Sequence, residues 1–222
     1  VRIDWGYFYM AADKENSSCA TGEGKTLRKS FIDGKLTSSK TDGSDKLALV
    51  RSLGETKKAE GHLLLGYDDL YSIQYFGENL RPYWNRNGNE TIQSQFAKAD
   101  KEYDAVMDKC AAFDANLMKE ATEVGGRKYA ELCALAYRQA IAAHKLVEAP
   151  NKDLLFLSKE NFSNGSIGTV DITYPSAPLF LVYNPELAKG LMNHIFYYSE
   201  SGKWNKLFAA HDVGTYPLAN GQ

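Results

Sequence analysis

The chain has 222 residues, 44% of them hydrophobic, and its 26 basic and 28 acidic side chains give a net charge of −2. This length suits one large domain or two modest ones, and the apolar content excludes a disordered chain. We expect no nucleic-acid partner, since there is no basic excess, and no membrane span, since no apolar run reaches the roughly 18 residues that a bilayer requires. No signal peptide is visible after Val1.

Short stretches rich in β-forming residues occupy the first 85 residues. Turn-forming clusters such as "SSKTDGSDK" separate them, a pattern typical of an antiparallel sheet or sandwich. The predicted strands lie in "IDWGYFYMAA", "TLRKSFI", "KLALVRSL" and "GHLLLGYDDLYSIQYF". The segment "RPYWNRNGNE" then interrupts the pattern. We therefore predict a β-rich, sandwich-like region over residues 1–85 and a second domain over residues 90–222.

The period of the apolar residues becomes helical in this second region. One stripe with steps of three and four runs from Tyr103 to Leu117, and another runs from Tyr129 to His144. Such steps place apolar side chains on one face of a helix. The Gly-Gly pair at 125–126 separates the two stripes. The sequence therefore predicts two helices joined as an αα-hairpin.

A further helix is predicted after residue 183. Asn184 can cap it, Pro185 suits the first helical position, and Glu186 suits the positive end of the helix dipole. Gly202 can terminate this helix. Between the hairpin and this helix, residues 151–183 are predicted as a loop with short strands, and such a long connection in a compact domain is usually functional. The predicted fold class is α+β.

Two familiar motifs are approximated but incomplete. "TGEGKT" has Cys19 where a phosphate-binding loop requires its first glycine, and we interpret the segment as a surface turn. "NGSIG" at 164–168 has Asn164 where the nucleophile elbow has its first glycine, so Ser166 is interpreted as a turn hydroxyl. The four histidines show no metal-ligand spacing. We predict neither a metal site nor a cofactor.

Three carboxylates are candidate catalytic groups: Glu160, Asp171 and Asp212. Each lies in or near irregular backbone beside Asn, Tyr or Pro. General acid and base catalysis requires two carboxyl groups in different environments, and glycoside hydrolysis also requires a set separation between them. Ordinary roles remain open as well, because either aspartate can cap a turn or helix and Glu160 can form a salt bridge.

Candidate substrate-binding residues surround these carboxylates in the sequence. Aromatic rings stack on sugar faces as well as packing in cores, and the candidates are Tyr174, Trp204, Tyr216, Asn161 and His211. On a strand, the adjacent side chains of His211 and Asp212 would point to opposite faces. A catalytic pair between these two residues is therefore the weaker hypothesis, and Asp212 acting alone is the stronger one.

Four long stretches together resemble the glutaminase A family over nearly the whole chain. They are "YDDLYSIQYFGENLRPYW", "YAELCALAYRQAIAAHKLV", "SKENFSNGSIGTVDITYPSAPLFLVYNPEL" and "FYYSESGKWNKLFAAHDVGTYPLANGQ". The resemblance implies a β-sandwich region followed by a six-helical-hairpin, (α/α)6 toroid. Residues 1–85 would form the end of the first region and residues 90–222 the first part of the toroid, with the remaining hairpins after Gln222.

The resemblance also implies a function and a location. It implies glutamine deamidation by a secreted or periplasmic hydrolase, with a small-molecule substrate and with the rest of its own toroid as a partner of this fragment. Six-hairpin toroids also support glycoside hydrolases, so an oligosaccharide substrate with Glu160 and Asp212 as acid and base is an alternative. A third hypothesis is a non-catalytic fragment without turnover of its own.

Overall fold

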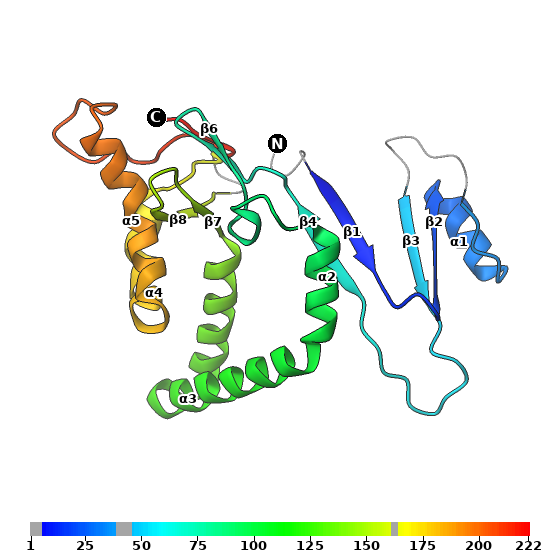
Figure 1. Cartoon of the computed structure of the whole chain (residues 1–222). Coiled ribbons are helices and arrows are strands. Elements are labelled where there is room, and N and C mark those ends of the chain that lie inside the picture. Colours follow the sequence, from blue (N-terminus) through cyan, green and yellow to red (C-terminus); the bar gives the residue numbers. More distant parts are fainter. Residues whose placement is uncertain (1–5, 39–45, 161–163) are drawn as a thin grey trace. The chain divides into compact units, whose positions relative to one another are not determined.

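The computed structural model describes residues 6–38, 46–160 and 164–222 (Figure 1). It contains both helices and strands, and the α+β class is confirmed. The chain divides into two compact units: the smaller is Tyr7–Asp68, and the larger is Asp69–Gln222 together with Gly6. The predicted boundary between sequence domains at residues 85–90 stays a prediction.

The smaller unit contains two antiparallel strand pairs. Strand β1 (Tyr7–Ala11) pairs with β4 (Leu64–Asp68), and β2 (Ser17–Gly22) pairs with β3 (Lys46–Arg51). In the part of this unit that the structure describes, the strands therefore pair two by two and form no larger sheet.

The predicted strand "TLRKSFI" is wrong, because these residues lie in helix α1 (Gly24–Ile32). The side chain of Glu23 caps this helix by accepting hydrogen bonds from the backbone N–H groups of Lys25 (2.9 Å) and Thr26 (2.8 Å). These bonds hold the pKa of the Glu23 carboxyl below its usual value. A strand-to-helix junction does exist here, but a carboxylate already occupies the amides that a phosphate would need.

The larger unit contains a three-stranded sheet built from distant parts of the chain. Strand β5 (Ile73–Tyr75) lies in the centre, antiparallel to β6 (Glu78–Leu80) and parallel to β9 (Leu218–Ala219). A separate antiparallel pair consists of β7 (His144–Glu148) and β8 (Leu154–Ser158). The sheet and this pair, together with helix α5 (Pro185–Glu200), enclose the main hydrophobic core.

The predicted αα-hairpin is confirmed. Helix α2 (Ile92–Lys101) precedes α3 (Tyr103–Ala142), and the backbone of α3 is non-helical at Gly126, where φ is 80°. Phe113 and Tyr137 lie equally far from Gly125 along the chain, and their ring centroids are 5.0 Å apart. The rings of Phe113 and Tyr137 therefore join the two arms of α3 on either side of the bend.

Two boundaries of this region differ from the prediction. The second arm of α3 ends at Ala142, so His144 belongs to β7 and not to the helix. The predicted loop at 151–183 is wrong in its second half, which forms helix α4 (Val170–Tyr183). This helix contains Pro175 and Pro178, which remove N–H donors from the helical ladder and so disguise it in the sequence.

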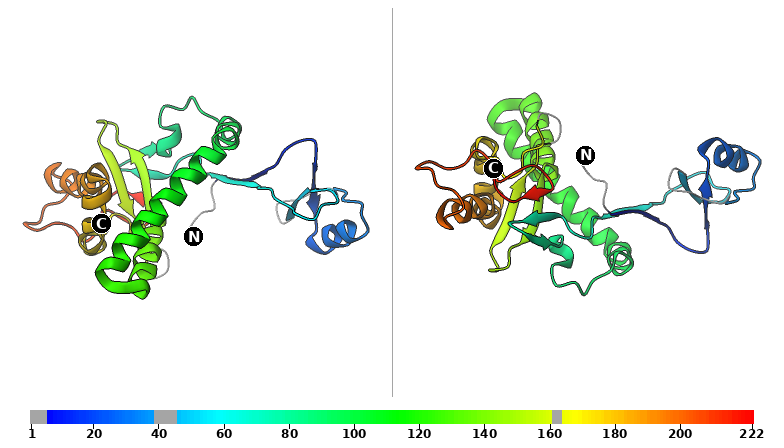
Figure 2. Two further views of the ribbon diagram at one scale, coloured as in Figure 1. Left: turned by 90° about the horizontal axis from the view of Figure 1, so that it is seen from below. Right: turned by 90° about the horizontal axis from the view of Figure 1, so that it is seen from above.

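The predicted third helix is confirmed as α5 (Pro185–Glu200). The side-chain oxygen of Asn184 accepts a hydrogen bond from the N–H of Leu187 (3.4 Å), as expected of a capping residue. Helices α4 and α5 lie side by side next to the β7–β8 pair (Figure 2). They bury a second apolar cluster with β8 that contains Phe156, Phe180, Ala188 and Leu191.

Strand β8 is buried on both faces. Leu155 and Leu157 point into the main core, whereas Phe156 between them points toward α4 and α5, as the two-residue period of a strand requires. This strand therefore gives a rigid base to the irregular segments that follow it. No helix in the described ranges is long and apolar enough to cross a membrane.

A fully buried histidine lies on α5 beneath one of these segments. His194 has 0% exposure, and its ring lies against the backbone of Gly190 and Gly168. A Cβ atom on Gly168 would lie only 2.6 Å from this ring, so the backbone packs directly on it. Burial lowers the pKa of His194 from 6.5 to about 4, because the charged imidazolium loses its hydration.

We expect the free energy of unfolding to decrease as the pH falls from about 6.5 toward 4. The unfolded chain takes up a proton on His194 near the ordinary pKa, whereas the folded chain does not, so protonation favours unfolding by up to about 1.4 kcal/mol per pH unit. Urea unfolding at pH 7.5, 6 and 5 measures this slope. The apolar variant His194→Leu should show a smaller slope, and an equal slope in both proteins would contradict this origin.

Candidate functional site

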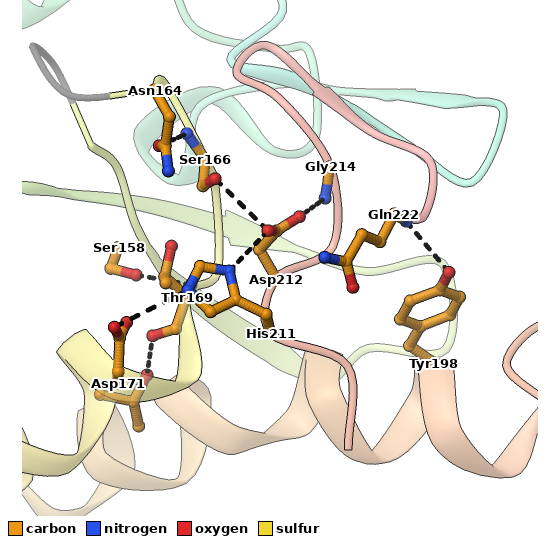
Figure 3. A network of polar contacts seen from close by, with 11 residues as sticks. Ser158, Asn164, Ser166, Thr169, Asp171, Tyr198, His211, Asp212, Gly214 and Gln222 are labelled. Atoms are coloured by element: carbon orange, nitrogen blue, oxygen red, sulfur yellow. Dashed lines mark hydrogen bonds and ion pairs between the residues drawn. The ribbon is translucent and has the colours of Figure 1, made fainter. Parts of the chain in front are cut away.

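Three irregular segments of the larger unit meet at the N-terminal end of α4 (Figure 3). The N–H of Glu160, just after β8, donates to the carbonyl of Ser166 (2.9 Å), and Ser166 forms an antiparallel bridge with Thr215. The N–H of Val170, the first residue of α4, donates to the carbonyl of His211 (2.9 Å). These bonds bring the segments that carry Glu160 and Asp171 next to the segment that carries Asp212 and leads into β9.

Asp212 is the buried carboxylate of this site, with 7% exposure. Its Oδ2 atom lies 2.8 Å from Nδ1 of His211 and accepts a 3.3 Å hydrogen bond from Oγ of Ser166, and its Oδ1 accepts the N–H of Gly214 at 2.8 Å (Figure 3). Three partners thus hold the carboxylate in one orientation. The expectation that His211 and Asp212 point apart is wrong, because this segment is irregular and not a strand.

The imidazole of His211 is half-exposed and faces carboxylates from other elements. Its side chain is 47% exposed, and Nε2 lies 3.7 Å from Oδ2 of Asp171 in the first turn of α4. The hydrogen bond to Asp212, followed by the charges of Asp171, Asp212 and Glu160, raises the pKa of His211 above 6.5. All three candidate carboxylates therefore act electrostatically on one imidazole.

This arrangement resembles the acid–base half of a catalytic triad in its roles. When Nδ1 of His211 is protonated, it donates a hydrogen bond to Asp212. The exposed Nε2 is then the nitrogen that can accept a proton from a substrate or water. The buried carboxylate selects this tautomer and stabilises the imidazolium that forms. The site can therefore perform general base and then general acid catalysis.

The predicted substrate-binding residues lie in different environments. Tyr174 on α4 is 84% exposed, whereas Tyr216 is buried in the main core. The indole N–H of Trp204 donates to the carbonyl of Phe208, so it already has an acceptor. Asn161 lies outside the described residues. The substrate-binding roles of these residues stay predictions.

Two contributors to this site were not found from the sequence. Ser166, interpreted as a turn hydroxyl, donates to a carboxylate 46 residues away. Gly214 was not considered, although its N–H fixes the other oxygen of Asp212. The only local signal is Asn164, whose side-chain oxygen accepts the N–H of Ser166 at 2.8 Å and shapes the turn. In the described ranges, no group of three or more His, Cys, Asp or Glu side chains is arranged so that it could hold a metal ion.

Comparisons with known proteins cover almost the whole chain. The family model of the glutaminase A six helical-hairpin domain matches residues 126–222, and that of a domain of unknown function (DUF5127) matches residues 1–120. Glutaminase A of Aspergillus oryzae is 30% identical over an alignment of 235 positions, gaps included, which covers 99% of this chain and 34% of the relative. A probable glutaminase of Arthroderma benhamiae is 32% identical over 104 residues, which are 47% of this chain and 12% of the relative.

The chain thus spans about a third of the length of the Aspergillus relative. No solved structure matches it.

Proposed function

We propose that the protein hydrolyses the side-chain amide of glutamine, because the chain resembles the glutaminase A family over almost its whole length. Both relatives carry a glutaminase name, which supports a hydrolase of this kind. The observation that carries the proposal is the His211–Asp212 pair, in which a buried carboxylate orients a half-exposed imidazole.

Amide hydrolysis needs both a base and an acid. Nε2 of His211 takes a proton from water as the water oxygen attacks the amide carbon. The imidazolium then gives this proton to the departing nitrogen as the C–N bond breaks, so that glutamate and ammonia leave. Asp212 keeps the ring in the required tautomer throughout, because its oxygen stays bonded to Nδ1.

Asp171 and Glu160 adjust the basicity of His211 in this proposal. A nearby negative charge favours the imidazolium and so makes the neutral ring a stronger base. The exposed carboxylate of Asp171, with 71% side-chain exposure, also faces solvent beside Nε2. It can therefore attract the α-ammonium group of free glutamine toward the imidazole.

The carbohydrate-active alternative has less support. It needs aromatic rings that converge on a pair of carboxyl groups. Tyr174 is exposed on a helix, Tyr216 is buried in the core, and Trp204 packs on Tyr198 with ring centroids 5.5 Å apart. Neither relative is named for action on a sugar.

The proposed function is tested by incubating the natural full-length protein with L-glutamine. Released ammonia and glutamate are measured together, and L-asparagine serves as the matched substrate control. We expect equimolar ammonia and glutamate from glutamine. A folded protein that releases no ammonia above the uncatalysed background would overturn the proposal.

The pH profile of this activity provides a further prediction. Since the base form of His211 is required and its pKa is raised, the acidic limb of kcat/KM should have its midpoint above pH 6.5. Asp171→Asn removes one of the charges that raises the pKa, so the midpoint should move to lower pH. Glu186→Gln, which removes the acidic side chain from the first turn of α5, is the control and should leave the midpoint in place.

A further inference from the structure

A polar cavity outside the His211 site lies beside β6 and the turn between β7 and β8. Its volume is about 370 Å³, and its polar and aromatic lining includes Tyr71, Asn79, Arg81, Arg86, Glu148 and Lys152. All of these residues belong to the larger unit. We call this cavity the cationic pocket, because three of its side chains carry a positive charge and one carries a negative charge.

Arg81 is the least satisfied charged group of the cationic pocket. Its guanidinium carbon lies 5.1 Å from the ring centroid of Tyr71, within the range of a cation–π contact. Arg81 is half-buried, and in the part of the chain that the structure describes its N–H groups have no acceptor. A half-buried guanidinium with five donors and no protein acceptor is suited to bind an anion.

Arg86 and Lys152 extend this positive surface. The guanidinium of Arg86 lies 4.2 Å from the ring centroid of Tyr83, and its Nε is 3.5 Å from Oε2 of Glu148. The ammonium of Lys152 lies 2.8 Å from Oε1 of the same glutamate. The carboxylate of Glu148 is therefore shared by the cations of Arg86 and Lys152. With Arg81, the pocket has three positive charges and one negative charge, which gives a net charge of about +2.

We propose that the cationic pocket binds a phosphate group, free or as the ester of a small molecule. Guanidinium forks bind tetrahedral oxyanions through paired hydrogen bonds, and two such forks line this pocket, each beside a tyrosine ring. The net charge of the pocket matches a doubly charged phosphate better than a singly charged carboxylate. The volume exceeds that of a bare anion and leaves room for an attached organic group.

This binding is independent of the proposed hydrolysis, because the cationic pocket shares no residue with the His211 site. The test is therefore direct: isothermal titration of the folded protein with inorganic phosphate, in buffer of constant ionic strength set with sodium chloride. We expect saturable binding with a stoichiometry near one. Arg81→Ala should weaken it by about tenfold or more, as expected for the loss of hydrogen bonds to a charged group.

The matched control is Arg127→Ala, which removes the same charge from α3. This arginine has 84% side-chain exposure and pairs with Glu131 at 2.9 Å, far along the chain from the pocket. Its variant should bind phosphate within twofold of the wild type. No saturable binding in the wild type, or equal weakening by both arginine variants, would overturn the proposal.

A second variant keeps the test decisive if Arg81→Ala does not fold. The side chain of Lys152 is 75% exposed, so Lys152→Gln should leave the fold intact and weaken phosphate binding severalfold. A parallel titration with glycerol 3-phosphate distinguishes the two sources of the group. Tighter binding of the ester indicates a phosphorylated small molecule, and equal binding indicates free phosphate.

Discussion

Asp212→Asn is expected to lower kcat for glutamine hydrolysis by a factor of about 10² to 10⁴, the usual size of a general acid–base contribution. The carboxylate of Asp212 accepts from Ser166 and Gly214 and lies 2.8 Å from Nδ1 of His211. An amide at this position can present an N–H to Nδ1, which would place the imidazole proton on Nε2. The exposed nitrogen could then no longer accept a proton from water.

The measurement compares kcat and KM of the variant with those of the wild type at pH 8, with thermal unfolding as a check of the fold. Asp108→Asn, on the exposed surface of α3, is the matched control and should leave kcat unchanged. Ser166→Ala should have a smaller effect than Asp212→Asn, since the contacts with His211 and Gly214 remain. A folded Asp212→Asn protein with wild-type kcat would contradict the assigned role.

Gly214→Ala is expected to destabilise the larger unit by more than about 3 kcal/mol or to prevent its folding. The φ angle of Gly214 is +129°, a conformation that side-chain-bearing residues rarely adopt. A Cβ atom would lie 2.3 Å from the carbonyl oxygen of Leu218, which is backbone of β9 and cannot rotate away. The chain between the site and β9 would therefore have to shift.

Gly202→Ala is the matched control for this effect. Gly202 also has a positive φ, of 77°, but no atom lies within 4 Å of the position of its Cβ. Its substitution should cost only the conformational strain, about 1–2 kcal/mol. Urea unfolding of both variants measures the difference, and equal losses of stability would show that the contact with Leu218 is not responsible.

Several elements could be predicted because their causes are local. The cap at Asn184 and the proline after it predict the start of α5 within one turn. The apolar stripes and the glycines at 125–126 predict the αα-hairpin in the same way, since helical periodicity and backbone freedom act over a few residues.

Other elements escaped prediction because the local signal was misleading. The segment "TLRKSFI" is rich in β-forming residues but becomes α1, because the carboxylate of Glu23 caps its first turn. Helix α4 contains two prolines, yet Phe180 and its neighbours pack against α5 and β8, and this burial outweighs the lost hydrogen bonds.

The sequence by itself determined the fold class, the hairpin, the last long helix and the family resemblance, because each depends on residues near one another or on long matching stretches. The tertiary structure alone decided which polar side chains meet at the candidate site. It bends the chain at 211–214 so that His211 meets Asp212, and it pairs Gln74 of β5 with Leu218 of β9. These contacts depend on how distant segments pack around a shared core, which no local pattern encodes.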